Sequence, residues 1–238
     1  RNATVAARKA QAGWAGANAY LRGQILYRIA EMLEGRREQF IAELKLQGAT
    51  QHAARKEVDT SIDRLIYFAG WADKYQQVFS AVNPVASSHF NFSVLEPTGV
   101  VSIISPDDSG LLGLVSNVAP TIVGGNTCVV LASESMPLSA VSFAEVLHAS
   151  DVPAGVVNII TGLRSELTEH FASHMDVNAI VFCDGARKTA KTVQELASDN
   201  IKRVIARADI DWSRESSQHP YLIRDTQEVK TTWHPIGS

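Results

Sequence analysis

The segment VVSIISPDDSGLLG (residues 100–113) carries the pattern that decides the fold. It opens with the apolar run VVSII, passes through Pro106 and two aspartates, and continues into LLGLVSNVAPTIV (111–123), which has the composition of a buried helix. A short apolar strand that leads through a polar turn into a helix is the repeating unit of α/β proteins. These proteins place their chemistry where the strands end, so Asp107 and Asp108 need an explanation.

Four more apolar runs follow, and a helix-sized segment separates each from the next. They are TCVVLA (127–132), VVNII (156–160), AIVFC (179–183) and KRVIA (202–206). Runs that are apolar throughout, rather than at every second residue, indicate strands buried on both faces. We therefore predict an α/β fold, Rossmann-like and doubly wound, with a five-stranded parallel sheet.

The residues before these runs predict helices. One helix is expected from about residue 20 to Gly48, with Ile25, Ile29, Leu33 and Phe40 on its buried face, and a second from about Glu57. FNFSVLEP (90–97) then predicts a half-buried strand. The predicted organisation is an N-terminal helical part of a nucleotide-binding-type domain (1–82), the Rossmann-like sheet and its helices (83–210), and a linker with an oligomerisation flap (211–238).

The tail YLIRDTQEVKTTWHP (221–235) predicts one long strand. Gln227, Val229, Thr231 and Trp233 alternate with the residues between them, as on one face of a strand. The preceding sheet pattern offers this strand no partner, and an isolated strand is not stable alone. We expect it to pair with another copy or with another part of a parent chain.

Composition excludes several classes of function. A formal net charge of −3 over 238 residues gives no electrostatic reason to expect nucleic acid or an anionic membrane as a partner. No apolar stretch approaches the roughly 20 residues of a membrane-spanning helix. The start RNATVAARK has neither an initiator Met nor a signal-like segment, so we expect a fragment of a longer, cytoplasmic chain. Cys128 and Cys183 lie in apolar runs and are expected to be buried and reduced.

Two interpretations stand for the residues that follow the first and second strands. Asp107 and Asp108 fit capping of the next helix, which the pattern favours, or a carboxylate pair for acid–base work or a divalent metal. Glu134 fits a contact to a ribose hydroxyl or a solvated side chain.

The residues after the third and fourth strands carry weaker signals. Gly162 is a single glycine where a dinucleotide site would use two or three, and Arg164 fits a contact to a phosphate or a solvated side chain. Asp184 and Gly185 precede a helix start that could hold a phosphate, but Asp184 would oppose its charge. His170 and His174 have metal-ligand spacing without a third ligand, so we predict no metal site. The residues alone thus indicate a fold that is common among enzymes, without a recognisable set of catalytic residues.

Several longer segments together resemble the coenzyme-binding half of an aldehyde dehydrogenase. They are EPTGVVSIISP (96–106), APTIVGGNTCVVLASESMPLSA (119–140), LHASDVPAGVVNIITG (147–162), NIKRV (200–204) and DTQEVKT (225–231). The resemblance implies a fold built to bind NAD. It also implies that residues 223–235 correspond to the strand through which members of that family join a partner subunit.

The resemblance breaks at the family's functional positions. Asp108 stands where the family has the Asn that donates to the oxyanion, and Arg207 stands where it has the general base Glu. Leu131-Ala132-Ser133-Glu134 replaces Lys-Pro-Ala-Glu, so the Lys is lost and Glu134 is kept. Asp184-Gly185 replaces the Gly-Ser at the pyrophosphate, and Asp209 and Ile210 replace two glycines. The catalytic domain with its nucleophilic Cys is missing, and neither Cys128 nor Cys183 is at that position.

This combination is similar to the C-terminal, non-catalytic domain of the two-domain aldehyde dehydrogenases called family 16. We therefore expect a pseudoenzyme domain that acts as a built-in second subunit. Its partner would be the catalytic domain of its own chain, in a homo-oligomer. The domain itself would have no dehydrogenase activity and no bound cofactor, with Glu134, Gly162, Asp184 and Gly185 as vestiges, and NAD would serve the parent enzyme.

Two alternatives stay open. One is a coenzyme-sensing regulatory module that retains weak NAD binding through Glu134 and Gly162. The other is an enzyme of altered chemistry that uses Asp107 and Asp108, which would need a partner acid, base or metal.

Overall fold

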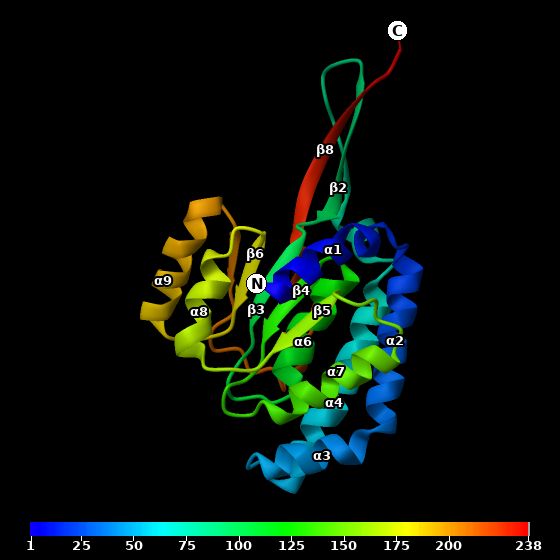
Figure 1. Cartoon of the computed structure of the whole chain (residues 1–238). Helices are drawn as coiled ribbons and strands as arrows, with labels where there is room; N and C mark the ends of the chain where they lie inside the picture. The colour runs from blue at the N-terminus through cyan, green and yellow to red at the C-terminus, as the bar shows by residue number, and fades with distance from the viewer. Residues whose placement is uncertain (238) are drawn as a thin grey trace.

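The computed structural model describes residues 1–237, in which the strands form two sheets (Figure 1). The larger sheet is parallel, in the order β5-β4-β3-β6-β7, and the smaller is antiparallel, in the order β1-β2-β8. The larger sheet contains β3 (Val100–Ile104), β4 (Thr127–Leu131), β5 (Val157–Ile160), β6 (Ala179–Phe182) and β7 (Arg203–Ala206). Each of these strands falls on one of the five apolar runs, so the predicted parallel sheet is confirmed.

Alternate residues of this sheet pack against helical layers on its two faces. Val101, Ile103 and Val130 join a large core with α2 (Ala19–Gly35), α4 (Gln51–Trp71), α6 (Leu112–Val123) and α7 (Leu138–Ala149). Val100 and Ile104 point the other way, into a smaller core with α1 (Asn2–Gly16), α8 (Arg164–Ser173) and α9 (Arg187–Ala197). Burial on both faces explains why the strands are apolar throughout.

The N-terminal helices differ from the prediction at two boundaries. The expected single helix is divided, because α2 ends at Gly35, Arg36 leaves the helical conformation (φ −107°, ψ 15°), and α3 (Arg37–Leu46) begins after it. The next helix, α4, starts at Gln51 rather than near Glu57, because the Thr50 side chain accepts a hydrogen bond from the Ala53 N–H (3.2 Å) and caps it. The short α5 (Tyr75–Phe79) follows.

The smaller sheet projects from the body as an arm (Figure 1). We use "the arm" for β1 (Ala81–Asn83), β2 (His89–Pro97) and β8 (Gln227–Pro235). β8 pairs with β2 along its whole length, from His89 opposite Pro235 to Pro97 opposite Gln227. The prediction that the tail strand has no partner in this chain was therefore wrong. Within residues 1–237 the outer edge of β8 is unpaired.

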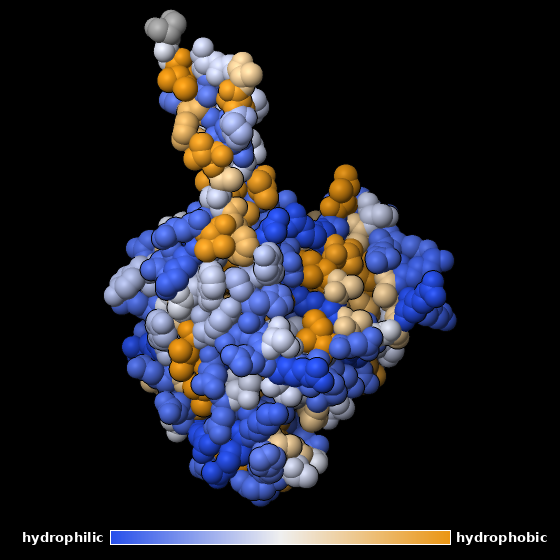
Figure 2. All heavy atoms as spheres, turned by 180° about the vertical axis from the view of Figure 1, so that it is seen from behind, coloured by the Kyte–Doolittle hydropathy of each residue, from blue (hydrophilic) through white to orange (hydrophobic). Residues whose placement is uncertain are grey.

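The four residues predicted to form an interaction face on β8 divide into two groups. Val229 and Trp233 are 60% and 57% exposed, and hydrophobic atoms are visible along the arm (Figure 2). Thr231 is also exposed, and its hydroxyl is hydrogen-bonded to that of Ser93 (2.8 Å). Gln227 is buried at the base of the arm, where its Nε2 donates to the Gly124 carbonyl (3.2 Å). Gln227 is thus an anchor, which corrects its assignment as an interaction residue.

Lys202, just before β7, gives a prediction for stability. It is buried, its Nζ donates to the His174 carbonyl (2.9 Å), and burial lowers its pKa from 10.5 to about 8. At pH values between about 8 and 10.5 the Lys202 amine is protonated in the unfolded chain but largely neutral in the folded one. The contribution of Lys202 to the free energy of unfolding therefore rises with pH across this range. We expect that the free energy of unfolding of wild type rises by up to about 3 kcal/mol relative to that of Lys202→Met across this window. Urea unfolding of both proteins measures this, and parallel pH profiles would contradict it.

Candidate functional site

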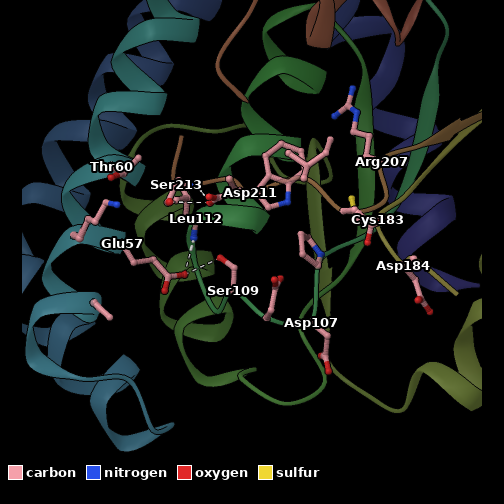
Figure 3. Close-up of a pocket in the computed structure, with 18 of the residues that line it drawn as sticks. Glu57, Thr60, Asp107, Ser109, Leu112, Cys183, Asp184, Arg207, Asp211 and Ser213 are labelled. Carbon is pink, nitrogen blue, oxygen red and sulfur yellow. Dashed lines mark hydrogen bonds between the residues drawn. The ribbon is translucent and has the colours of Figure 1, made fainter. Parts of the chain in front are cut away.

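A cleft of about 730 Å³ opens at the carboxyl ends of the parallel strands (Figure 3). Its walls are the segments that follow β3, β6 and β7, together with one side of α4. This is the edge at which doubly wound sheets bind their ligands. The sequence-predicted residues Asp108, Asp184, Gly185 and Arg207 all line it, whereas Glu134 and Gly162 are not among its lining residues.

The start of α6 is capped by Glu57 of α4. Glu57 Oε1 accepts hydrogen bonds from the Leu111 N–H (2.9 Å), the Leu112 N–H (3.0 Å) and the Ser109 hydroxyl (2.8 Å; Figure 3). A carboxylate there satisfies free N–H groups and complements the helix dipole. The prediction that Asp107 or Asp108 caps this helix was therefore wrong.

Asp107 stabilises the loop after β4 instead. Its Oδ1 accepts from the Glu134 N–H (2.7 Å), the Ser135 N–H (3.1 Å) and the Ser133 hydroxyl (3.1 Å), and lies 3.7 Å from Arg164 Nε. Partial burial acts to raise the pKa of Asp107, but these hydrogen bonds and Arg164 outweigh it, so the pKa lies below its ordinary value. Asp108 is exposed on the cleft wall. The two side chains therefore have separate surroundings, and Asp107 is fully engaged.

The start of α8 is also occupied by a carboxylate. Glu134 Oε2 accepts a hydrogen bond from the Arg164 N–H (2.6 Å), the first residue of that helix. The Arg164 side chain donates back to the Ser105 carbonyl at the end of β3. Gly162 is exposed just before this helix. Glu134 therefore binds this chain's own backbone rather than projecting freely toward a ligand.

Two aspartates meet at the turn before α9, Asp184 within the turn and Asp209 from the segment after β7. Asp184 Oδ1 accepts from the Ala186 N–H (2.9 Å), and a Cβ on Gly185 would lie 3.1 Å from Asp209 Oδ1. Asp209 has φ +57°, in the left-handed region that favours glycine. The backbone at 209 thus keeps a glycine-like conformation, while its side chain brings a carboxylate toward Gly185.

Arg207 is buried at the end of β7. Its guanidinium donates to Asn117 Oδ1 (2.7 Å), Asp225 Oδ2 (3.0 Å) and the Leu222 carbonyl (3.4 Å). These contacts join β7, α6 and the segment that leads to the arm, through α10 (Tyr221–Arg224). Arg207 therefore has a structural role and is not placed to accept a proton.

The two cysteines have no features of a nucleophile. Both are buried with free thiols, and burial raises the pKa of each, to about 12 for Cys183. Within residues 1–237, no three His, Cys, Asp or Glu side chains group as metal ligands. α8 ends at Ser173, so His170 and His174 do not share a helical face.

A profile of the aldehyde dehydrogenase family matches residues 1–208. The chain belongs to this family. Among its relatives, hydroxyisobutyraldehyde dehydrogenase of Mycolicibacterium austroafricanum is 36% identical over 192 residues, which are 80% of this chain and 37% of the relative. Cytosolic aldehyde dehydrogenase 1 of Elephantulus edwardii is 35% identical and covers the same share of this chain, with 38% of its own length matched.

Two solved structures are similar to this chain. PnpE from Pseudomonas sp. WBC-3 superimposes with a TM-score of 0.81 at 30% identity, covering 86% of this chain and 42% of its own. Betaine aldehyde dehydrogenase from Staphylococcus aureus, solved in complex with NAD+, has a TM-score of 0.80 at 28% identity and covers 86% and 41%. This aldehyde dehydrogenase-family chain therefore spans about two fifths of the length of these proteins.

The roles of three residues at the site were not predicted from the sequence, where Arg164 was considered only for a phosphate contact and Glu57 and Trp212 not at all. Glu57 comes from α4, more than fifty residues before the helix it caps. Arg164 links the ends of β3 and β4 to α8. Trp212 closes one side of the cleft with its neighbours. A local motif identifies none of them, because each depends on contacts between distant segments.

Among the helices of residues 1–237, none combines the length and the apolar character that crossing a bilayer requires.

Proposed function

We propose that this chain is a non-catalytic structural domain of a longer aldehyde dehydrogenase-family protein, of the kind found as the second domain of family 16. In this proposal it supports a catalytic domain of the same chain and contributes to oligomer formation through the arm. NAD would then serve the catalytic domain of the parent, and this domain would bind none.

The observation that carries the proposal is the state of the helix starts around the cleft. Glu57 occupies the start of α6, Glu134 the start of α8, and Asp184 the turn before α9. Free N–H groups at helix starts are what a doubly wound sheet offers to phosphate. Here this chain's own carboxylates accept from them, so a dinucleotide would have to displace internal hydrogen bonds and approach like charges.

The cleft lining as a whole disfavours an anion. It contains one glutamate and five aspartates against three basic side chains, two of which, Arg164 and Arg207, are hydrogen-bonded to the protein. Lys56 is the third. Pyrophosphate recognition depends on positive potential, which this balance does not supply.

The arm supports the structural role. It projects from the body, its edge strand β8 offers unpaired backbone groups, and Val229 and Trp233 are exposed on it. Proteins protect such edges by pairing them with another strand. Pairing with a sheet of the catalytic domain would cover both the edge and these side chains.

A second candidate function is NAD sensing. It is favoured by the size of the cleft and by the likeness to PnpE, which has been solved in complex with nicotinamide adenine dinucleotide. Under this alternative, Glu134 would release Arg164 when the nucleotide binds.

Calorimetric titration of NAD into this chain separates the two functions. We expect no heat of binding up to millimolar NAD, with Staphylococcus aureus betaine aldehyde dehydrogenase as the positive control. Saturable binding with a Kd below about 1 mM would contradict the structural proposal. If Glu134→Ala then altered that Kd, NAD sensing would be supported.

A further inference from the structure

A short irregular segment connects β7 to α10, and we call its residues 208–218 the strap. Apart from one 3-10 turn, Glu215–Ser217, it contains neither helix nor strand. Its first part, Asp209 to Ser213, forms one wall of the cleft. The strap lies almost entirely beyond the family match, which ends at residue 208.

A single side chain provides the hydrogen bonds between the strap and the body. Arg64 of α4 donates through Nη2 to the Trp212 carbonyl (2.9 Å) and the Arg214 carbonyl (3.5 Å). The other hydrogen bonds recorded for the strap, within residues 1–237, are internal. Examples are those that Asp211 accepts from the Ser213 N–H (3.0 Å) and Arg214 Nε (3.1 Å). The strap can therefore separate from the body without breaking any sheet or helix.

Arg64 is an unusual anchor because its guanidinium lacks both a full set of hydrogen bonds and an acidic partner. It is 1% exposed, its Nε and Nη1 have no hydrogen-bond partner, and no ion pair to it is found in residues 1–237. Burial lowers its pKa. A buried charge without a counter-charge destabilises the state that buries it, and donors without acceptors add to this effect.

Arg22 provides the contrast within the same protein. It is similarly buried and also lacks an acidic partner, but it donates to the carbonyls of Val123 (2.8 Å), Ala15 (3.5 Å) and Ala17. None of its nitrogens is both buried and without a hydrogen-bond partner. Arg164 and Arg207 each have one such nitrogen, so within residues 1–237 Arg64 is the buried arginine with the least complete set of hydrogen bonds.

One large apolar contact opposes this destabilisation. Trp212 is 5% exposed and packs in the main core, so its burial holds the strap against the body.

We propose that the strap is a gate over the cleft that opens by local unfolding. Trp212 holds it closed, and the unpaired charge of Arg64, which regains water on opening, keeps the closed state only marginally favoured. Asp209, with its left-handed φ of +57°, and Pro220 bound the moving part.

Opening has a consequence for the cleft. Because Asp209, Asp211 and Trp212 line it, their departure removes one wall and two carboxylates together. The opened cleft is wider and less acidic than the closed one. The gate is independent of the arm, since α10 and β8 remain attached through Arg207 and Arg203.

Limited trypsin digestion of the whole chain under native conditions tests the gate. Arg214 is the reporter, since its side chain is 73% exposed and lies in the strap. We expect cleavage after Arg214 to precede cleavage elsewhere and to be unaffected by concentrations of urea too low to unfold the body. Arg64→Met, which removes the charge but keeps an apolar side chain, should slow this cleavage roughly fivefold. Trp212→Ala should accelerate it about tenfold or more.

Arg22→Met is the matched control and should leave the ratio of cleavage after Arg214 to cleavage in the body unchanged. Faster or unchanged cleavage after Arg214 in Arg64→Met would overturn the proposal, as would cleavage that follows global unfolding in wild type. Hydrogen–deuterium exchange of the strap amides gives the same comparison without a protease. It remains interpretable with Trp212→Phe if Trp212→Ala does not fold.

Discussion

Replacing Arg207 by glutamate is expected to lower the free energy of unfolding by about 3–5 kcal/mol, or to prevent folding. The wild-type guanidinium is buried and donates to Asn117 Oδ1 (2.7 Å) and Asp225 Oδ2 (3.0 Å). A glutamate would place a second buried carboxylate beside Asp225, and the oxygen of Asn117 would lose its donor. A glutamate at this position, which resembles that of the family's general base, would therefore disrupt the interior rather than restore a base.

Urea unfolding monitored by circular dichroism measures this effect. Arg207→Met should cost less, about 1–3 kcal/mol, since it removes donors without adding a charge. Arg187→Glu, on the exposed first turn of α9, is the surface control and should stay within about 0.5 kcal/mol of wild type. An Arg207→Glu protein as stable as wild type, or one that gains dehydrogenase activity, would contradict the structural role of Arg207.

Removing residues 229–238 is expected to weaken docking to the catalytic domain of the parent by about 100-fold or more, because the pairing edge is lost. The boundary follows from the structure. Leu222, Ile223 and Gln227 are buried in the body, so a deletion that began at 221 would damage the fold as well as the arm. A deletion that begins at Val229 retains Gln227 and its hydrogen bond to Gly124.

Binding of the truncated chain to the separately produced catalytic domain checks this prediction. The double variant Val229→Asp/Trp233→Asp keeps β8 but makes its exposed side chains acidic, and should weaken docking in the same direction. Val82→Asp lies on β1, at the opposite edge of the arm, and should leave docking unchanged. Undiminished docking of the truncated chain would show that the arm is not the contact.

The sheet was predictable because its signal is local. Strands buried on both faces must be apolar throughout, and Val100 to Ile104 meets that condition within five residues. The partner of β8 was not predictable in this way. β2 and β8 were both recognisable as strands, but 130 to 146 residues separate their paired positions, and no local pattern records which strands pair. The break at Arg36 was missed because apolar residues continue at helical spacing on both sides of it.

The candidate site was predicted only in part, for a similar reason. Asp108, Asp184 and Arg207 follow strands of the predicted sheet, at the ends where α/β proteins bind ligands, and all three line the cleft. What these side chains do depends on distant partners, as with Glu57 at α6 or Asn117 and Asp225 around Arg207. Composition at a loop therefore indicates where a site would be, and long-range contacts decide whether it is free to bind.

Hydrogen–deuterium exchange of the β8 amides, with and without the catalytic domain of the parent, shows whether this domain supports its partner through the arm. We expect the amides of residues 228–234 that face the free edge of β8 to exchange at least about tenfold more slowly in the complex, since backbone pairing protects them. Amides of β5, the far edge of the larger sheet, should be unchanged. Unchanged exchange along β8 in a mixture where the two parts bind would contradict the claim that this domain supports its partner through the arm.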